Sequence, residues 1–291
     1  RAGRWVEAGE TLARSVRRKL VSAEDGRRAR SVISYCLGLE ALARDDGAGY
    51  LKALAKAHDL DPEFIPAAVS LARPLAAPND LPLDGKGRVY FTSRTGNPPK
   101  TAATAVYRID PDGKLTQLLV DPTQVDRRSV GGKATQNSGR PTTTDMPNGI
   151  VTSPDNKTLY LIEAHPQADH LRNIRAFDLG TDGSLSNGRV HINFYPGRSG
   201  DGMCIDANGN LYVAAGLHKT RKTSETLDTK PGIHVISPAG KLVAYVETPE
   251  DTITNCTFGG KDLRILYVAC GTLLLSIPTK IPGKAVYRPQ R

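Results

Sequence analysis

Residues 148–161 read NGIVTSPDNKTLYL. A run of apolar and β-branched residues comes first, a Pro-Asp-Asn turn follows, and a second such run contains Tyr160. Two short β-branched runs joined by a turn are typical of antiparallel strands. The segment therefore predicts a β-hairpin whose first strand opens on a polar residue, Asn148.

The same pattern occurs four times in the chain. In each copy an Asn or Asp is followed after 11 or 12 residues by a Tyr. The copies are NDLPLDGKGRVYF from Asn79, NGIVTSPDNKTLYL from Asn148, DGMCIDANGNLYV from Asp201 and NCTFGGKDLRILYV from Asn255. A second pair of strand-like segments follows each copy, and the last pair is the shortest. Four strands in about 50 residues is typical of a β-propeller blade.

The opening strand of a propeller blade lies nearest the central axis. We therefore expect Asn79, Asn148, Asp201 and Asn255 to point together at one mouth of a central channel. A polar, Gly/Thr-rich insertion separates the first two copies at residues 121–145. A loop of that length is typically either functional or disordered.

The first 76 residues have a different composition, in which Ala, Arg and Leu dominate. Their spacing predicts helices near residues 3–20, 25–44, 48–58 and 62–75. Val32, Tyr35, Cys36, Leu39 and Leu42 form an amphipathic stripe within the second. Asp61-Pro62 is a helix-start signal. We predict a helical N-terminal segment, residues 1–76, followed by a propeller-like domain, residues 77–291, in a mainly β chain.

The composition excludes several function classes. The net charge is +9, from 39 Lys and Arg against 30 Asp and Glu, but the basic residues form no long run. With five Phe and one Trp for base stacking, the sequence predicts no nucleic-acid partner. No apolar run reaches the roughly 18–20 residues of a membrane span. The compartment stays open between the bacterial cytoplasm and export to the periplasm.

The four repeats resemble the last four blades of the gluconolactonase/regucalcin (SMP-30) family of six-bladed propellers. The resemblance rests on PNDLPLDGKGRVYFTS, PNGIVTSPDNKTLYLIEA, GDGMCIDANGNLYVAAG and TNCTFGGKDLRILYVACG, in this order. It implies a metal-dependent hydrolase of sugar lactones or related esters, with a small-molecule lactone as substrate. It also implies that a divalent metal, usually Ca²⁺, sits at the top of the channel, with Zn²⁺, Mn²⁺ and Mg²⁺ left open.

Carried over by motif, the metal ligands would be Asn148 of PNG and Asp201 of DGM, with Asn79 of PND as ligand or substrate contact. The resemblance implies that the metal polarises the lactone carbonyl while Asp201 acts as general base on water. An Asp in a DG turn is also common for purely structural reasons. Asn255 completes the repeat but lies outside the ligand set of the family, so we interpret it as structural.

The chain departs from the family at its N-terminus. The E-G-P motif, whose Glu is a metal ligand in the family, is absent, and so is a second blade. Either helices replace two blades, or the chain, which opens on Arg1, is incomplete or misassembled. Glu163 and Asp80 are the nearest carboxylates that could replace the Glu, and both are also candidate substrate contacts. His218 and the loop after it are candidates for covering the substrate.

Two alternatives to the hydrolase stay open. One is a non-catalytic propeller scaffold that binds a ligand or a protein partner, because the Glu-bearing blade is missing. The other is an open arc whose exposed blade edges pair with another chain, since unpaired strand edges favour association.

Histidine and cysteine residues have simpler interpretations. His165 and His170 lie five residues apart between two carboxylates, which could suggest zinc, but a loop lacks the fixed face of an HExxH helix. The spacing of Cys36, Cys204, Cys256 and Cys270 fits no zinc motif. We predict free, buried thiols.

Overall fold

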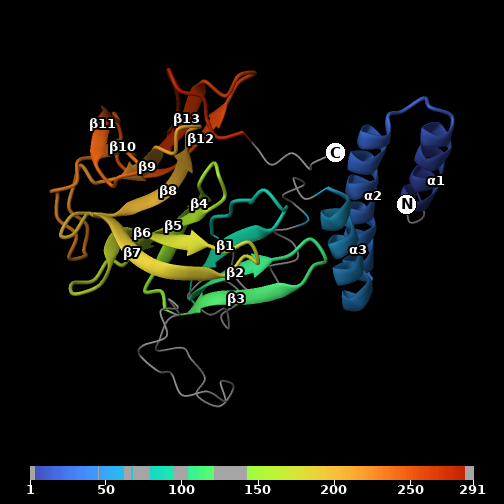
Figure 1. Cartoon of the computed structure of the whole chain (residues 1–291), viewed down its shortest axis with the longest axis horizontal. Helices are drawn as coiled ribbons and strands as arrows, with labels where there is room; N and C mark the ends of the chain where they lie inside the picture. Colours follow the sequence, from blue (N-terminus) through green and yellow to red (C-terminus); the bar gives the residue numbers. More distant parts are fainter. Residues whose placement is uncertain are drawn as a thin grey trace, which may run out of the picture.

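The computed structural model describes residues 4–44, 46–61, 67, 79–94, 104–120 and 143–285. Fourteen strands form four antiparallel sheets in the described residues, and each sheet corresponds to one sequence repeat (Figure 1). Their bounds are β1 Val89–Ser93, β2 Ala105–Ile109 and β3 Leu115–Val120; β4 Pro147–Thr152, β5 Thr158–Ala164, β6 Arg172–Leu179 and β7 Leu185–Asn193; β8 Gly200–Ile205, β9 Leu211–Ala215, β10 Gly232–Ile236 and β11 Leu242–Glu247; and β12 Ile253–Gly259, β13 Ile265–Cys270 and β14 Leu273–Pro278. The predicted hairpins and the mainly β fold are confirmed.

The first sheet has an additional inner segment beside β1. The backbone N–H of Asn79 donates to the carbonyl of Thr92 at 2.9 Å, and Thr92 N–H donates to the carbonyl of Asp80 at 3.1 Å. Tyr90 N–H donates to the carbonyl of Pro82 at 3.0 Å. Residues 79–83 therefore occupy the position that β4 and β8 hold in their own sheets.

The inner strands of successive sheets pack against one another. Strand β4 contacts both β1 and β8, and β8 contacts β12. Between the second and third sheets lies a buried apolar cluster that includes Ile162, Met203 and Val213. Burial of such side chains contributes about 1.5–3 kcal/mol each to folding. This packing brings the polar start of each inner strand to one end of the structure.

Three helices precede the sheets in the part of the chain that the structure describes: α1 Arg4–Arg17, α2 Ala23–Ala43 and α3 Gly47–Leu60. The side chain of Asp46 accepts a hydrogen bond from Gly49 N–H at 2.8 Å and caps α3. Figure 1 shows the helices together at one side, next to the sheet of β1–β3. A Cβ at Gly113, in the β2–β3 turn, would lie 3.1 Å from Cβ of Ala55 in α3. The predicted division at residue 76 stays a prediction.

The predicted stripe on α2 is not its buried face. Val32 and Leu39 are exposed, whereas Ser31, Ser34 and Ala41 are buried. Ser31 Oγ donates to the carbonyl of Ala57 at 2.7 Å, so small residues let α2 and α3 approach closely. The stripe is therefore wrong at Val32 and Leu39, where small residues form the helix contact instead, whereas Tyr35 and Cys36 are half-buried and Tyr35 packs against the cluster that contains Leu54. The predicted helix 62–75 with its Asp61-Pro62 start, and the insertion up to residue 142, lie almost wholly outside the described residues.

Three further expectations concern cysteines, edges and membranes. All four cysteines are free, with Cys256 and Cys270 buried and Cys36 and Cys204 partly so.

Outer strands expose Val243 and Leu274, but association through such edges stays a prediction. Among the described residues, no helix has the length and apolarity needed to cross a membrane.

Candidate functional site

The three predicted metal ligands meet at the start of the inner strands. Asn79 Nδ2 donates a hydrogen bond to Asn148 Oδ1 at 2.5 Å, and Asn148 Nδ2 donates to Asp201 Oδ1 at 2.8 Å. Asn148 is buried, Asp201 is partly buried and Asn79 is exposed. The side chains therefore form a continuous chain that opens to solvent at Asn79.

Irregular strand pairing explains why these side chains point to the axis. The register of β4 with β5 shifts between Pro147 and Ile150, and that of β8 with β9 shifts between Gly200 and Met203. The pairing of β12 with β13 shifts just before Asn255. A bulge bends a strand and re-aims the side chain it carries. Each shift coincides with the polar residue that opens a sequence repeat.

Glycines next to these polar residues allow the inner strands to approach. A Cβ on Gly149 would lie 2.6 Å from the carbonyl oxygen of Asp201, and one on Gly202 would lie 2.2 Å from Cγ of Asn255. Both distances are shorter than a Cβ contact tolerates. The Gly of PNG and the Gly of DGM are therefore needed for close packing at the site.

Asp80 is a second carboxylate at the axis. Its Oδ1 accepts from Leu81 N–H at 3.0 Å and its Oδ2 from Ile150 N–H at 3.3 Å, and the Asn255 side chain also hydrogen-bonds to it. Burial raises the pKa of Asp80 to about 6, and the charge of Asp201 acts in the same direction. The predicted contact residue therefore lies at the site, and it joins Asn255 to it.

Two arginines accompany the carboxylates. Arg198 Nη2 donates to Asp201 Oδ2 at 2.9 Å, and its Nη1 lies 3.3 Å from the carbonyls of both Gly216 and Ile253. Burial lowers the pKa of Arg198 and also that of Arg94, whose guanidinium interacts electrostatically with Asp201. Neither Arg94 nor Arg198 was predicted from the sequence as a site residue. The position of Arg198, three residues before the DGM motif, was the available signal.

Glu163 lies beside the site and supports the chain that enters it. It is fully buried on β5, where its carboxylate accepts from Thr144 Oγ1 at 2.8 Å and from Met146 N–H at 2.9 Å. Asp145 N–H and Arg175 Nη1 donate to it at 3.1 and 3.3 Å. Burial raises the pKa of Glu163. The carboxylate is thus engaged by donors that fix residues 144–146, immediately before Asn148.

His218 lies on the loop after β9. Its Nε2 is 3.0 Å from the carbonyl of Thr248, and its backbone N–H donates to Asp251 Oδ2 at 3.3 Å. The same loop begins at Gly216, whose carbonyl lies 3.3 Å from Arg198 Nη1. His218 is therefore connected to the site through the backbone that Arg198 holds.

A cavity of about 500 Å³ runs along the inner strands and reaches the site at Asp80 and Asn255, whereas Asn79, Asn148 and Asp201 are not part of its lining. Its lining includes Asp80 and Asn255 near the polar cluster, Met203 and Cys256 along the wall, and Lys284. Lys284 Nζ donates to Thr152 Oγ1 at 2.6 Å, and burial lowers its pKa to about 8. Small-molecule sites have volumes of roughly 300–1,000 Å³ and few polar groups, so the cavity is large enough for a sugar-sized ligand.

The SMP-30/Gluconolactonase/LRE-like region family matches residues 131–272, which include Asn148 and Asp201. The resemblance to this family is confirmed. Bovine regucalcin is 35% identical over 130 residues, covering 43% of this chain and 38% of that protein. Human regucalcin is 33% identical over 128 residues with the same coverage. The match therefore spans less than half the length of these relatives.

A solved gluconolactonase from Xanthomonas campestris is 27% identical, with a TM-score of 0.51. The similarity covers 72% of this chain and 58% of that protein. The similarity to this structure supports the propeller-type architecture of the sheets.

Proposed function

We propose that this protein hydrolyses sugar lactones at the mouth of the cavity, with a divalent cation bound by Asn79, Asn148 and Asp201. The observation that carries the proposal is the hydrogen-bonded chain of these three side chains, which come from three different repeats. The similarity to the Xanthomonas gluconolactonase and to regucalcin supports the same assignment.

The donor set fits a hard cation. Two amides and one carboxylate offer oxygen ligands, which Ca²⁺ and Mg²⁺ prefer. The 2.5 and 2.8 Å hydrogen bonds join Asn79 to Asn148 and Asn148 to Asp201, so a bound cation would require the amides to turn their oxygens toward it. Ca²⁺ is the cation we favour, and Mg²⁺, Mn²⁺ and Zn²⁺ are alternatives. Such an ion, when bound, polarises an ester carbonyl and stabilises the charge that develops on its oxygen.

The protein's own residues supply positioning and proton transfer. Asn79 and Asn148 orient Asp201, and Asp201 accepts the proton of the attacking water. Water adds to the acyl carbon, the ring C–O bond breaks, and the proton held by Asp201 passes to the leaving ring oxygen, which gives the open-chain hydroxy acid. Arg198 holds Asp201 in place from the opposite side, and the cavity accommodates the sugar.

A hydrolysis assay with matched variants tests the proposal. Proton release from δ-gluconolactone is measured for the unaltered protein, Asp201→Ala and Asp228→Ala, where Asp228 is an exposed aspartate that accepts a hydrogen bond from Thr226. We expect Asp228→Ala to retain the rate and Asp201→Ala to lose at least 100-fold, about the effect of one catalytic proton-transfer group. Equal rates for the two variants would contradict the proposal.

Calcium binding without turnover is the second candidate. Both carboxylate oxygens of Asp201 already have donors, Arg198 at 2.9 Å and Asn148 at 2.8 Å, which counts against Asp201 taking a proton from water. Calorimetry separates the two candidates, because a binding protein takes up Ca²⁺ through Asp201 and does not hydrolyse lactone.

A further inference from the structure

Three potential metal ligands meet outside the central site, where the β5–β6 loop lies against the entry to β4. His170 Nδ1 lies 2.9 and 3.1 Å from the two carboxylate oxygens of Asp145. The rings of His165 and His170 are stacked with their centroids 3.6 Å apart. One ligand atom from each of the three residues lies within 4.8 Å of the others.

We propose that Asp145, His165 and His170 bind a divalent transition-metal ion, with Zn²⁺ as the best fit. Two imidazoles and one carboxylate are a common ligand set for zinc, and a water completes the coordination. Imidazole nitrogen selects Zn²⁺, Ni²⁺ and Cu²⁺ over Ca²⁺ and Mg²⁺. The donor chemistry therefore differs from that of the all-oxygen cluster at Asn148 and Asp201.

Buried Arg172 holds the loop that carries both histidines. Its guanidinium donates to the carbonyls of His165, Pro166 and Gln167, at 2.8, 3.1 and 2.8 Å. It also donates to the carbonyl of Pro196 at 2.7 Å, so the loop is tied to the next sheet. A backbone fixed in this way lowers the entropy cost of assembling ligands.

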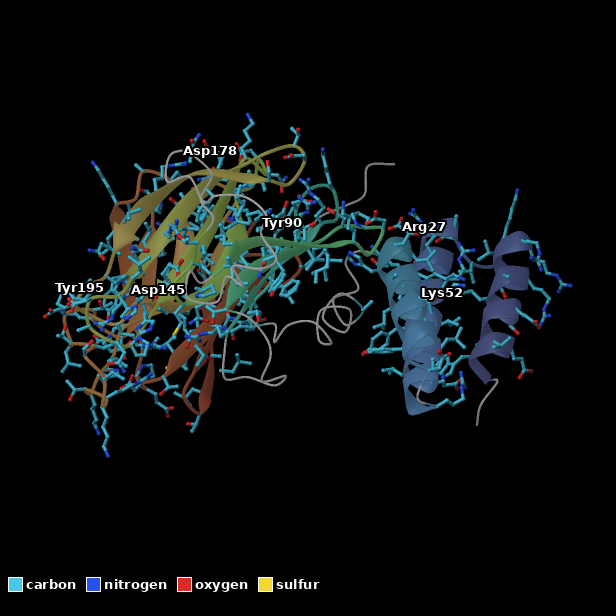
Figure 2. All side chains as sticks on the ribbon, turned by 90° about the horizontal axis from the view of Figure 1, so that it is seen from below. Arg27, Lys52, Tyr90, Asp145, Asp178 and Tyr195 are labelled. Carbon is cyan, nitrogen blue, oxygen red and sulfur yellow. The ribbon has the colours of Figure 1, made fainter. Side chains whose placement is uncertain are left out.

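Asp145 is held from the opposite side. Its backbone N–H donates to the buried carboxylate of Glu163 at 3.1 Å, and its own Oδ2 accepts from Leu171 N–H at 2.8 Å. Figure 2 shows Asp145 on the same flank of the sheets as Tyr195, away from the helices, and the Arg172 guanidinium lies 5.2 Å from the Tyr195 ring centroid. The ligand positions are thus set by contacts that involve no metal.

Because imidazole lone pairs lie in the ring plane, shared binding of one ion requires the two stacked rings to turn relative to each other. Ligands at about 2.0–2.1 Å from zinc are at most about 4.2 Å apart. Asp145 and His170 already satisfy this limit, and the ion would replace the proton between them. Nδ1 of His165 accepts the Gln167 N–H at 3.1 Å, so an ion bound through this nitrogen would replace that hydrogen bond. The His170 side chain is 44% exposed, which leaves its ring room to turn out of the stack.

The consequence is a structural ion that fastens the β5–β6 loop to the chain just before Asn148. Only Met146 and Pro147 separate Asp145 from the central cluster. Zinc at this position would restrain the start of β4 without occupying the cavity.

The proposal is tested by titrating chelator-treated protein with Zn²⁺ in a calorimeter and with Co²⁺ in a spectrophotometer. We expect one equivalent of Zn²⁺ to bind, and Co²⁺ to give visible bands of a site with nitrogen ligands. His170→Ala and Asp145→Asn should each weaken zinc binding at least tenfold.

Two control variants complete the design. His191→Gln removes a histidine that contacts Ser237 in another part of the structure, and Asp201→Ala disrupts the central cluster. Both should retain the zinc equivalent, as should protein in excess Ca²⁺. Absence of zinc binding to the unaltered protein, or unchanged affinity in a His170→Ala variant with a native circular dichroism spectrum, would overturn the proposal.

Discussion

Arg198 donates a 2.9 Å hydrogen bond to Asp201, the residue that the DGM motif places at the centre of the candidate site. The same guanidinium lies 3.3 Å from the carbonyls of Gly216, just after β9, and of Ile253, at the start of β12. It therefore connects both strands to the site. Arg198 therefore links the stability of the fold to the charge of the proposed metal-binding cluster.

Replacing Arg198 by Met should destabilise the protein by about 2–3 kcal/mol, because Asp201 and two carbonyls lose a charged donor. Urea unfolding measures the change. Arg189→Met is the matched control: Arg189 pairs with Asp178 at 2.7 Å, but both side chains are about half exposed. That pair should contribute less than about 1 kcal/mol. Equal losses in the two variants would show that Arg198 has no special structural role.

Arg198→Met should also bind Ca²⁺ more tightly than the unaltered protein, since a positive charge next to Asp201 is removed. Calorimetry at one ionic strength measures the affinity. An unchanged or weaker affinity in a folded variant would place the calcium ligands away from Asp201.

Gly202→Ala should lower both stability and calcium affinity, because its Cβ would lie 2.2 Å from Cγ of Asn255. We expect a loss of about 1–3 kcal/mol from overpacking. Gly9→Ala in α1 is the control, because the nearest atom to its Cβ would be 3.8 Å away. The control should be neutral or slightly stabilised. Thermal unfolding of both variants checks the difference, and a neutral Gly202→Ala would contradict the close approach of β8 and β12.

Glu163→Ala should unfold more readily than the unaltered protein, because four donors would lose a fully buried acceptor. A cost of about 3 kcal/mol is typical when one partner of a buried charged pair is removed. If Glu163 only supports residues 144–146, the folded variant should keep a KM for lactone within about threefold of the original. A much larger rise in KM at unchanged stability would instead indicate direct substrate contact, as the sequence analysis allowed.

Lys284 should make stability depend on pH in the alkaline range. Its pKa is about 8 in the folded protein, against 10.5 as the ordinary value. Between these values the unfolded chain binds the proton and the folded chain does not, so the free energy of unfolding rises with pH. The gain is at most about 3 kcal/mol from pH 8 to 10.5. Urea unfolding across this range should show a gain that Lys284→Met lacks, and parallel curves for the two proteins would contradict it.

The repeats predicted much of this architecture because local patterns decide hairpins. Asn148 and Asp201 lie at the start of strands in the sequence and in the structure. The glycine after each allows the neighbouring inner strand to approach closely. Residues 79–83 follow the same pattern, although they pair with β1 only as an extended segment. The polar residues converge as expected because the inner strands of neighbouring sheets are adjacent.

Contacts between distant parts of the chain could not be predicted in this way. The His165–His170 pair suggested zinc only weakly, since Asp145 lies 20 or more residues away along the chain and enters the cluster through the fold. The buried face of α2 depended on how closely α3 packs, which hydrophobicity alone does not encode. Arg198 was not predicted from the sequence. Its contact with Asp201 depends on the irregular strand pairing at the start of β8, which the spacing of the two residues does not show.

The metal dependence of lactone hydrolysis is the most direct test of the proposed function. Proton release from δ-gluconolactone is recorded first with Ca²⁺, then with excess chelator, and again after Ca²⁺ is restored. We expect turnover that the chelator abolishes and Ca²⁺ recovers, and that Asp201→Ala lacks throughout. Turnover that persists in chelator, or no turnover with any of Ca²⁺, Mg²⁺, Mn²⁺ and Zn²⁺, would contradict it.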